Sequence, residues 1–124
     1  MQTTVTAPTR SQTGLGTLGW IWQAVTGAAL IFLAGLHMFA QHFVVEGGLR
    51  DYQDVQDYLR NPVILVLEVL FLISVTSHAL LGVRAILFDF GLKPATEKRI
   101  SQALTVFGVL AVVYGVWLTW VVIR

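Results

Sequence analysis

The chain has 124 residues, of which 56% are hydrophobic, with eight Lys and Arg, seven Asp and Glu, and no cysteine. The lack of cysteine excludes disulfides, iron–sulfur ligation and thiolate chemistry within the chain, and a net charge of +1 without a basic patch gives no indication of nucleic acid as a partner. Charged residues are missing from 11–45, from 61–83 apart from Glu68, and from 100–123. Each stretch exceeds the roughly 20 apolar residues that cross a bilayer as a helix, so the sequence predicts an all-α protein with three transmembrane helices.

The first 17 residues are polar and rich in Thr and Gly, and they are predicted to form a flexible tail before a single membrane domain over 18–124. The tail lacks the charged start and short apolar core of a cleavable signal peptide, so the first helix is expected to remain in the mature protein. That helix is predicted over 18–44. It opens on Trp20 and Trp22, aromatic residues that suit the membrane interface.

The segment after the first helix has apolar and aromatic residues at spacings of three, three and one: Tyr52, Val55, Tyr58 and Leu59. This pattern predicts a short amphipathic helix that lies in the interface. The second transmembrane helix is predicted over 62–90, with Pro62 in its first turn and Gly91 at its end. The third is predicted over 101–123, with interface aromatics toward its end: Tyr114, Trp117 and Trp120.

Basic residues are more frequent on the side of the membrane that holds the N-terminus. That side has Arg10, Arg84, Lys93, Lys98 and Arg99, whereas the opposite side has Arg50, Arg60 and Arg124. Because cytoplasmic loops carry the excess of Lys and Arg, the N-terminus and the second loop are predicted to be cytoplasmic. The expected location is the cell's inner (cytoplasmic) membrane, crossed several times.

Polar residues inside the predicted helices fall on two stripes, and an ionisable group at membrane depth must face a bundle interior, a cavity or a cofactor. The stripe on the first helix, at steps of four and three residues, consists of Gln23, Gly27, Leu30, Ala34, His37 and Gln41. The stripe on the second consists of Glu68, Phe71, Val75, His78, Gly82, Ala85 and Asp89. Small residues on both stripes allow a close approach to the backbone.

His37 and His78 each have two interpretations. One is a hydrogen bond between packed helices; the other is ligation of haem iron by a neutral imidazole, with Gly27 and Gly82 making room for the flat ring. Zinc is disfavoured, because the chain has no cysteine and neither histidine has a second ligand three or four residues away. The two histidines lie at different depths, so haem binding by both predicts two stacked haems, each completed by a partner subunit. His42 lies about 140° around the helix from His37 and cannot share its metal.

Arg84 and Glu68 also have two interpretations each. Arg84 either extends to lipid headgroups or makes a bidentate bond to a haem propionate. Glu68 either relays protons or, as a neutral acid, bonds across helices. No catalytic nucleophile or acid–base pair is apparent, so the chain is expected to be a non-catalytic subunit whose redox chemistry belongs to a cofactor.

The run HALLGVRAILFDFG resembles the second-helix signature of the cytochrome b membrane anchors of succinate dehydrogenase and fumarate reductase. The residues that carry this resemblance are His78, Gly82, Val83, Arg84, Asp89, Phe90 and Gly91. In the first helix, Thr26, Gly27 and His37 are similar to the family's Ser/Thr-Gly pair followed by a histidine, and YLRNP before the second helix also fits. The resemblance covers about residues 20–95.

The resemblance implies a three-helix subunit, one of two that anchor a flavoprotein subunit and an iron–sulfur subunit to the lipid bilayer. It implies electron flow from succinate through flavin and iron–sulfur clusters to quinone, with haem b between the helices. By the same resemblance, His78 ligates the haem nearer the iron–sulfur subunit. His37 ligates the farther haem found in two-haem members, and the companion anchor supplies the other imidazole to each.

The chain departs from the family pattern just before Thr26. Several members have a Ser and a His-Arg pair there that bind quinone, whereas this chain has Trp20, Gln23 and Ala24 at the corresponding positions. The comparison therefore indicates the less quinone-active anchor, the D subunit, with residues at the edge of the quinone site: Trp20, Trp22 and Gln23. The alternatives are a haem-free anchor of the same complex and an unrelated, small proton-coupled membrane subunit.

Overall fold

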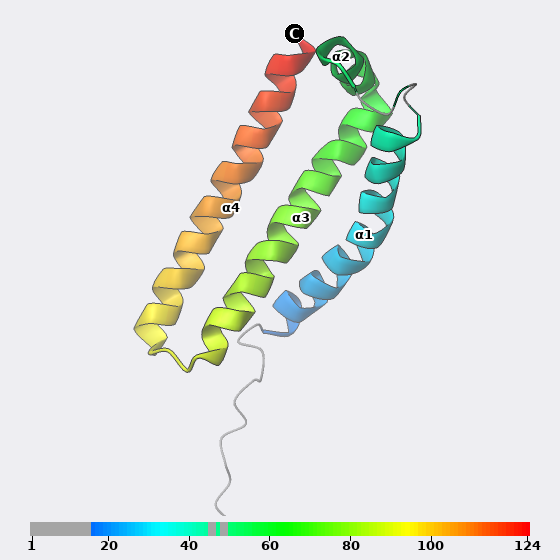
Figure 1. The fold of residues 1–124 in the computed structure, drawn as a ribbon. Helices are drawn as coiled ribbons and strands as arrows, with labels where there is room; N and C mark the ends of the chain where they lie inside the picture. Colours follow the sequence, from blue (N-terminus) through cyan, green and yellow to red (C-terminus); the bar gives the residue numbers. More distant parts are fainter. Residues whose placement is uncertain (1–15, 45–46, 48–49) are drawn as a thin grey trace, which may run out of the picture.

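The computed structural model describes residues 16–44, 47 and 50–124, and within these ranges the chain forms four helices (Figure 1). They are α1 (Thr17–His42), α2 (Tyr52–Arg60), α3 (Pro62–Asp89) and α4 (Pro94–Ile123). Helices α1, α3 and α4 are long and apolar enough to cross a membrane. The prediction of an all-α fold with three such helices and a short helix between the first two is confirmed. Thr17, assigned to the tail by the sequence, is the first residue of α1, and residues 1–15 lie outside the described ranges.

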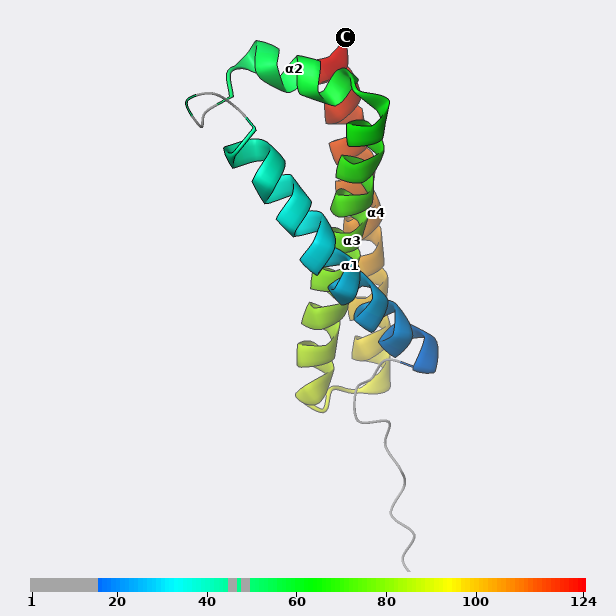
Figure 2. The same cartoon turned by 90° about the vertical axis from the view of Figure 1, so that its right-hand side faces the viewer.

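Helix α3 is the centre of the fold. Figure 1 shows α1 and α4 on opposite sides of α3, and both pack against it. In the perpendicular view, α1 crosses α3 obliquely while α4 runs beside it (Figure 2). Among the described residues, only Thr26, Leu33 and Gly108 are buried. This thin arrangement therefore leaves most apolar side chains to be covered by lipid or by another protein.

Local sequence determines where the helices begin and end. Asp51 and Asp54 form a reciprocal capping box at the start of α2. At the start of α3, the Asn61 side chain accepts a hydrogen bond from the Val63 amide, and Pro62 occupies the first turn. Gly91 follows α3 with φ of +67°, the left-handed conformation in which glycine commonly follows a helix.

Three predicted helix boundaries differ from those in the structure. Helix α4 begins at Pro94 rather than at residue 101, because Pro94 and Glu97 form a favourable first turn ahead of the apolar stretch. The backbone amide of Glu97 donates to the Lys93 carbonyl at 3.0 Å, which closes that turn. Helix α1 ends at His42 instead of residue 44, and α3 ends one residue before the predicted position 90.

Two glycines of α4 receive leucines of α3. A Cβ atom at Gly108 would lie 2.6 Å from Leu80 Cδ1, and one at Gly115 would lie 2.6 Å from Leu72 Cδ2. Both distances are below van der Waals contact, so the missing side chains are what allow α3 and α4 to pack this closely.

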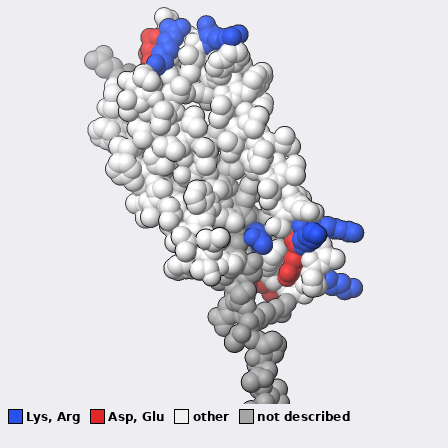
Figure 3. Space-filling model, turned by 180° about the vertical axis from the view of Figure 1, so that it is seen from behind, with Lys and Arg blue, Asp and Glu red and all other residues white. Residues whose placement is uncertain are grey.

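Residues 50–60, which comprise α2 and the two residues before it and are called the α2 region below, connect the ends of α1 and α4 through hydrogen bonds. The Arg50 guanidinium donates to the Ala40 carbonyl at 2.8 Å, and the Gln56 side-chain amide donates to the Val122 carbonyl at 2.7 Å. These carbonyls belong to the last turns of α1 and α4, where intrahelical donors run out. Figure 3 shows charged side chains gathered toward the two ends of the molecule, with an uncharged surface between them.

Candidate functional site

The polar stripes of α1 and α3 face each other along the contact between the two helices. At one end of the contact, Gln23 and Gly27 of α1 meet His78 and Gly82 of α3. At the other end, His37 of α1 meets residues of α3 and α2: Glu68, Phe71 and Tyr58. The structure thus places His78 together with Gln23, Gly27 and Gly82, and His37 in a second, separate group.

The His78 site is built on a turn of α1. His78 Nδ1 lies 3.2 Å from the Gln23 carbonyl oxygen and 3.2 Å from Thr26 Oγ1. The Thr26 hydroxyl itself donates to the Trp22 carbonyl at 2.8 Å, which leaves its oxygen free to accept. A Cβ atom at Gly27 would lie 3.0 Å from His78 Cε1. Gly27, predicted to make room for a haem ring, therefore makes room for the imidazole of His78.

These contacts determine which nitrogen of His78 carries the proton. A carbonyl oxygen only accepts hydrogen bonds, so the contact with Gln23 requires a hydrogen on His78 Nδ1. In the neutral imidazole, Nε2 is then the nitrogen with the free lone pair. Nε2 has no hydrogen-bond partner within the described residues, so it is the nitrogen available to a ligand.

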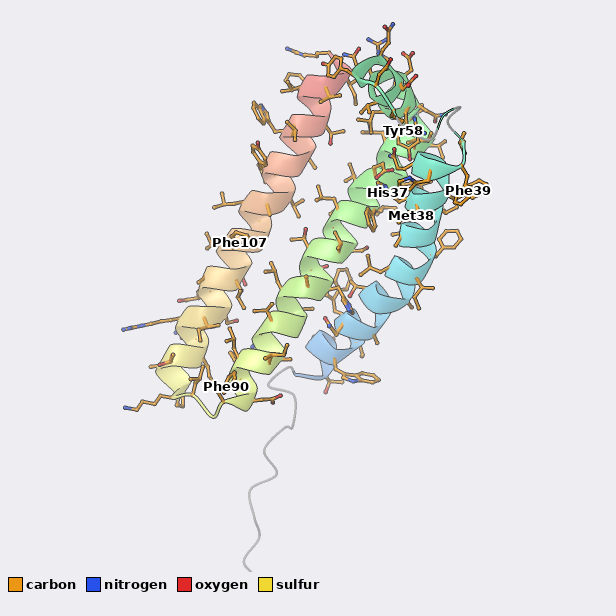
Figure 4. All side chains as sticks on the ribbon, viewed as in Figure 1. His37, Met38, Phe39, Tyr58, Phe90 and Phe107 are labelled. Atoms are coloured by element: carbon orange, nitrogen blue, oxygen red, sulfur yellow. The ribbon has the colours of Figure 1, made fainter. Side chains whose placement is uncertain are left out.

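The His37 site is built on a carboxylate. His37 Nδ1 lies 2.9 Å from each carboxylate oxygen of Glu68, and the Tyr58 hydroxyl donates to Glu68 Oε1 at 2.6 Å. The Phe71 ring stacks on His37 with centroids 4.9 Å apart. Figure 4 shows His37 close to Tyr58, at the end of the molecule where α2 lies. As at His78, the Nδ1 atom is held by the chain itself and Nε2 has no hydrogen-bond partner in the described ranges.

Tyr58 is the residue of this site that lies outside the membrane-spanning helices. Burial, its hydrogen bond to Glu68 and the charge of that carboxylate raise the pKa of Tyr58 to about 12, although the nearby positive charge of Arg50 acts in the opposite direction. The Arg50 guanidinium lies over the Tyr58 ring, 4.1 Å from its centroid. Tyr58 is therefore a protonated donor to Glu68 throughout the neutral pH range.

The two sites lie at different depths. Glu68 and His78 are separated by ten residues of α3, which corresponds to about 15 Å along the helix axis. His42 is exposed in the last turn of α1 and belongs to neither group.

Arg84 and Trp22 line a separate groove of about 480 Å³ between α3 and α4. The Arg84 guanidinium carbon lies 4.8 Å from the Phe88 ring centroid, and its buried Nε has no partner among the residues described. The side-chain oxygen of Gln23 is likewise buried without a partner there. Trp20 is largely exposed, so the three predicted quinone-edge residues do not line one cavity.

Comparisons with known proteins identify the family. The chain matches the family described as "Succinate dehydrogenase/Fumarate reductase transmembrane subunit" over residues 3–122. The chain belongs to this family. It is similar to the succinate dehydrogenase hydrophobic membrane anchor subunit of Archaeoglobus fulgidus, with 33% identity over 101 residues that cover 82% of this chain and 86% of the relative. It is also similar to the protein of the same description from Thermoplasma acidophilum, with 30% identity over 109 residues. These residues cover 88% of this chain and 89% of the relative. No solved structure matches.

Family membership makes the chain a membrane anchor subunit of succinate dehydrogenase and a multi-pass membrane protein. An anchor of this kind works within a complex of several subunits, which is consistent with the large apolar surface of α1 and α4. The expectation of an unrelated proton-coupled subunit is thereby ruled out.

Two features of the described residues are compatible with the expected haem b. A haem shared between two subunits needs one imidazole from each chain, and each of the two histidine sites presents one Nε2. The buried Arg84 Nε, which has no partner in the described part of the chain, is a donor suited to a propionate. Within the residues described, no three His, Asp or Glu side chains are close enough to hold one metal ion, and a shared haem does not require such a group.

Sequence reasoning missed Thr26 and Tyr58 as site residues. In the sequence, Thr26 stands out only as part of the family motif, yet it contacts His78, 52 positions away. Tyr58 was assigned to the apolar face of an interfacial helix, and no local spacing pattern indicates that it donates to Glu68.

Proposed function

We propose that this chain is the haem b-binding anchor of succinate dehydrogenase, with His78 and His37 as axial ligands of two haems. The observation that carries the proposal is common to both histidines. Each Nδ1 is held by groups of the chain, at 3.2 Å for His78 and 2.9 Å for His37, so each Nε2 is the available nitrogen. Metal-ligating histidines in proteins characteristically hold their second nitrogen in this way.

The haems would supply a one-electron carrier between the iron–sulfur subunit and quinone. In this proposal the companion anchor subunit provides the second imidazole of each haem. Gly82 gives the ring access to the α3 backbone. Arg84, six residues beyond His78 on α3 and beside the groove between α3 and α4, binds a propionate. Support comes from two observations on the described residues. An added Cβ at Gly82 would have Gln23 Nε2 as its near neighbour, at 3.7 Å, and the buried Arg84 Nε has no hydrogen-bond partner among them.

The distribution of basic residues between the two ends of the molecule indicates where the proposed partners bind. Arg84, Lys93, Lys98 and Arg99 lie at the end of the molecule with the α3–α4 turn, whereas Arg50, Arg60 and Arg124 lie at the other end. By the positive-inside rule, the α3–α4 turn faces the cytoplasm, and the start of α1 lies on the same side of the inner membrane. Arg10, which the sequence also places on that side, lies outside the described residues. The iron–sulfur and flavoprotein subunits dock there. Quinone binds mainly to the companion anchor, with Trp20, Trp22 and Gln23 at its edge, which makes this chain the D-type anchor.

A visible spectrum of the purified complex tests the proposal. The wild type is expected to show two b-type haems per flavin after reduction with dithionite. His78→Ala and His37→Ala are each expected to lose one haem, because each removes one axial ligand. His42→Ala serves as the matched control and is expected to keep both, since His42 is exposed at the end of α1. Full haem content in both histidine variants would contradict the assignment.

A haem-free anchor is the second candidate function. It is favoured by the same contacts, because His37–Glu68 and His78–Thr26 each join α1 to α3 and so serve as packing interactions between helices. A complex that transfers electrons to quinone without b-type absorbance would establish this candidate and overturn the first.

A further inference from the structure

The His37 site differs from the His78 site in the charge of the group that holds Nδ1. His78 Nδ1 faces neutral oxygens, whereas His37 Nδ1 faces both oxygens of the Glu68 carboxylate. The Glu68 side chain is only 18% exposed and that of His37 is 35% exposed, so the pair is largely shielded from water. The contact between the imidazole and a carboxylate therefore distinguishes the His37 site from the His78 site.

Glu68 is itself fixed from outside the membrane-spanning helices. The Tyr58 hydroxyl donates to Glu68 Oε1 at 2.6 Å, a short bond typical of a hydroxyl that meets a charged acceptor. Tyr58 is held in turn by Arg50, whose guanidinium lies over its ring and donates to the Ala40 carbonyl of α1. A chain of contacts thus runs from the α2 region to the imidazole of His37.

We propose that Glu68 is a positioning residue for His37 and that Tyr58 sets how strongly Glu68 acts. This inference rests on the proposed function, in which His37 ligates a haem. The carboxylate accepts the Nδ1 hydrogen, which fixes the tautomer and directs Nε2 toward the ligand position. The stacked Phe71 ring restricts the rotation of the imidazole about that direction. Neither Glu68 nor Tyr58 touches the iron in this arrangement.

The carboxylate also changes the donor strength of His37. An imidazole that donates to a carboxylate is a more basic ligand than one that donates to a carbonyl. A more basic ligand stabilises the ferric state more than the ferrous state, and so lowers the midpoint potential of the haem. The Tyr58 hydroxyl draws charge away from Glu68 and weakens this effect. The two residues therefore act on the potential in opposite directions.

Redox titration of the purified complex, monitored by haem absorbance, tests the inference. Glu68→Gln keeps the shape of the side chain and removes its charge, so the potential of the haem at His37 is expected to become more positive. Tyr58→Phe keeps the ring beneath Arg50 and removes the hydroxyl, so the same potential is expected to become more negative by a smaller amount. The haem at His78 is expected to keep its potential in both variants. Tyr52→Phe on the exposed face of α2 is the matched control and is expected to shift neither potential.

The outcomes separate this inference from the proposed function. If His37→Ala keeps both haems, the ligand assignment fails and the positioning role fails with it. If His37→Ala loses one haem but Glu68→Gln and Tyr58→Phe leave both potentials unchanged, only the positioning role is overturned. A merely structural role would lower thermal stability in these variants without moving a potential. If the Glu68→Gln complex does not assemble, the Tyr58→Phe variant alone tests the inference. A more negative potential of the haem at His37 supports it, and an unchanged or more positive potential overturns it.

Discussion

The two histidine sites use the same helix pair and differ in how each imidazole is held. At His78, the backbone of α1 provides the carbonyl acceptor, and Gly27 provides the space for the ring. At His37, a side chain of α3 provides the acceptor, and the α2 region fixes that side chain. One site depends on close helix packing, whereas the other depends on a network of polar side chains.

Because the two imidazoles are held differently, the two sites are expected to respond to different kinds of substitution. A histidine held by the backbone is sensitive to changes in volume, because the two helices must stay close for the contact to exist. A histidine held by a carboxylate is sensitive to changes in charge. The carboxylate and the imidazole are partly shielded from water, and electrostatic interactions are stronger in such surroundings. Substitutions that change only volume or only charge are therefore expected to act on one site and spare the other.

The largest effect is expected from Gly27→Leu. The added side chain would occupy the space of the His78 ring, so the His78 haem is expected to be lost, and overpacking of this kind costs about 1–3 kcal/mol of stability. Haem content per flavin and thermal unfolding of the complex measure the two effects. Gly35→Leu is the matched control on the same helix, because a Cβ at Gly35 would meet no other described part of the chain within 4 Å beyond its own stretch of helix. Retention of both haems in Gly27→Leu would show that close packing does not hold His78.

A smaller effect is expected from Thr26→Val. The substitution removes one of the two acceptors of His78 Nδ1 at nearly constant volume, and loss of a hydrogen bond of this type costs about 1 kcal/mol. The Gln23 carbonyl remains, so both haems are expected to be retained with a lower unfolding temperature. Thr105→Val is the control, because the Thr105 hydroxyl is exposed and bonds only to the Ser101 carbonyl one turn away. Equal unfolding temperatures for the two variants would show that the Thr26 hydroxyl does not help to hold His78.

The three membrane-spanning helices could be predicted from the sequence because the gaps in charge are long. The start of α4 could not, because residues 94–100 include three consecutive charged side chains and lie ahead of the uncharged stretch. Their helical conformation follows from Pro94 and a favourable first turn. The prediction of a short amphipathic helix between the first two spans was confirmed at Tyr52–Arg60 because its spacing pattern is local.

The site was predictable only within each helix. Periodicity placed His37 with Gly27 and His78 with Gly82, but nothing in either stripe indicates that the stripes face each other. The contact between Tyr58 and Glu68 depends on the bend at Asn61, which has the extended conformation that a following proline imposes. The bend itself is readable from the Asn-Pro pair, whereas the direction in which α2 folds back over α3 depends on tertiary contacts.

The smallest effect concerns alkaline pH and only the His37 site. The pKa of Tyr58 is raised from 10.0 to about 12 in the folded chain, so its neutral form is favoured by folding. This contribution is fully present below pH 10 and is lost as the pH rises toward 12, since the phenolate forms more readily in the unfolded chain. The unfolding temperature of the wild-type complex is therefore expected to fall over this range more steeply than that of Tyr58→Phe, with Tyr52→Phe behaving as the wild type. Parallel curves for all three would show that Glu68 and burial do not hold Tyr58 in its protonated form. The network at His37 would then lack its link to α2.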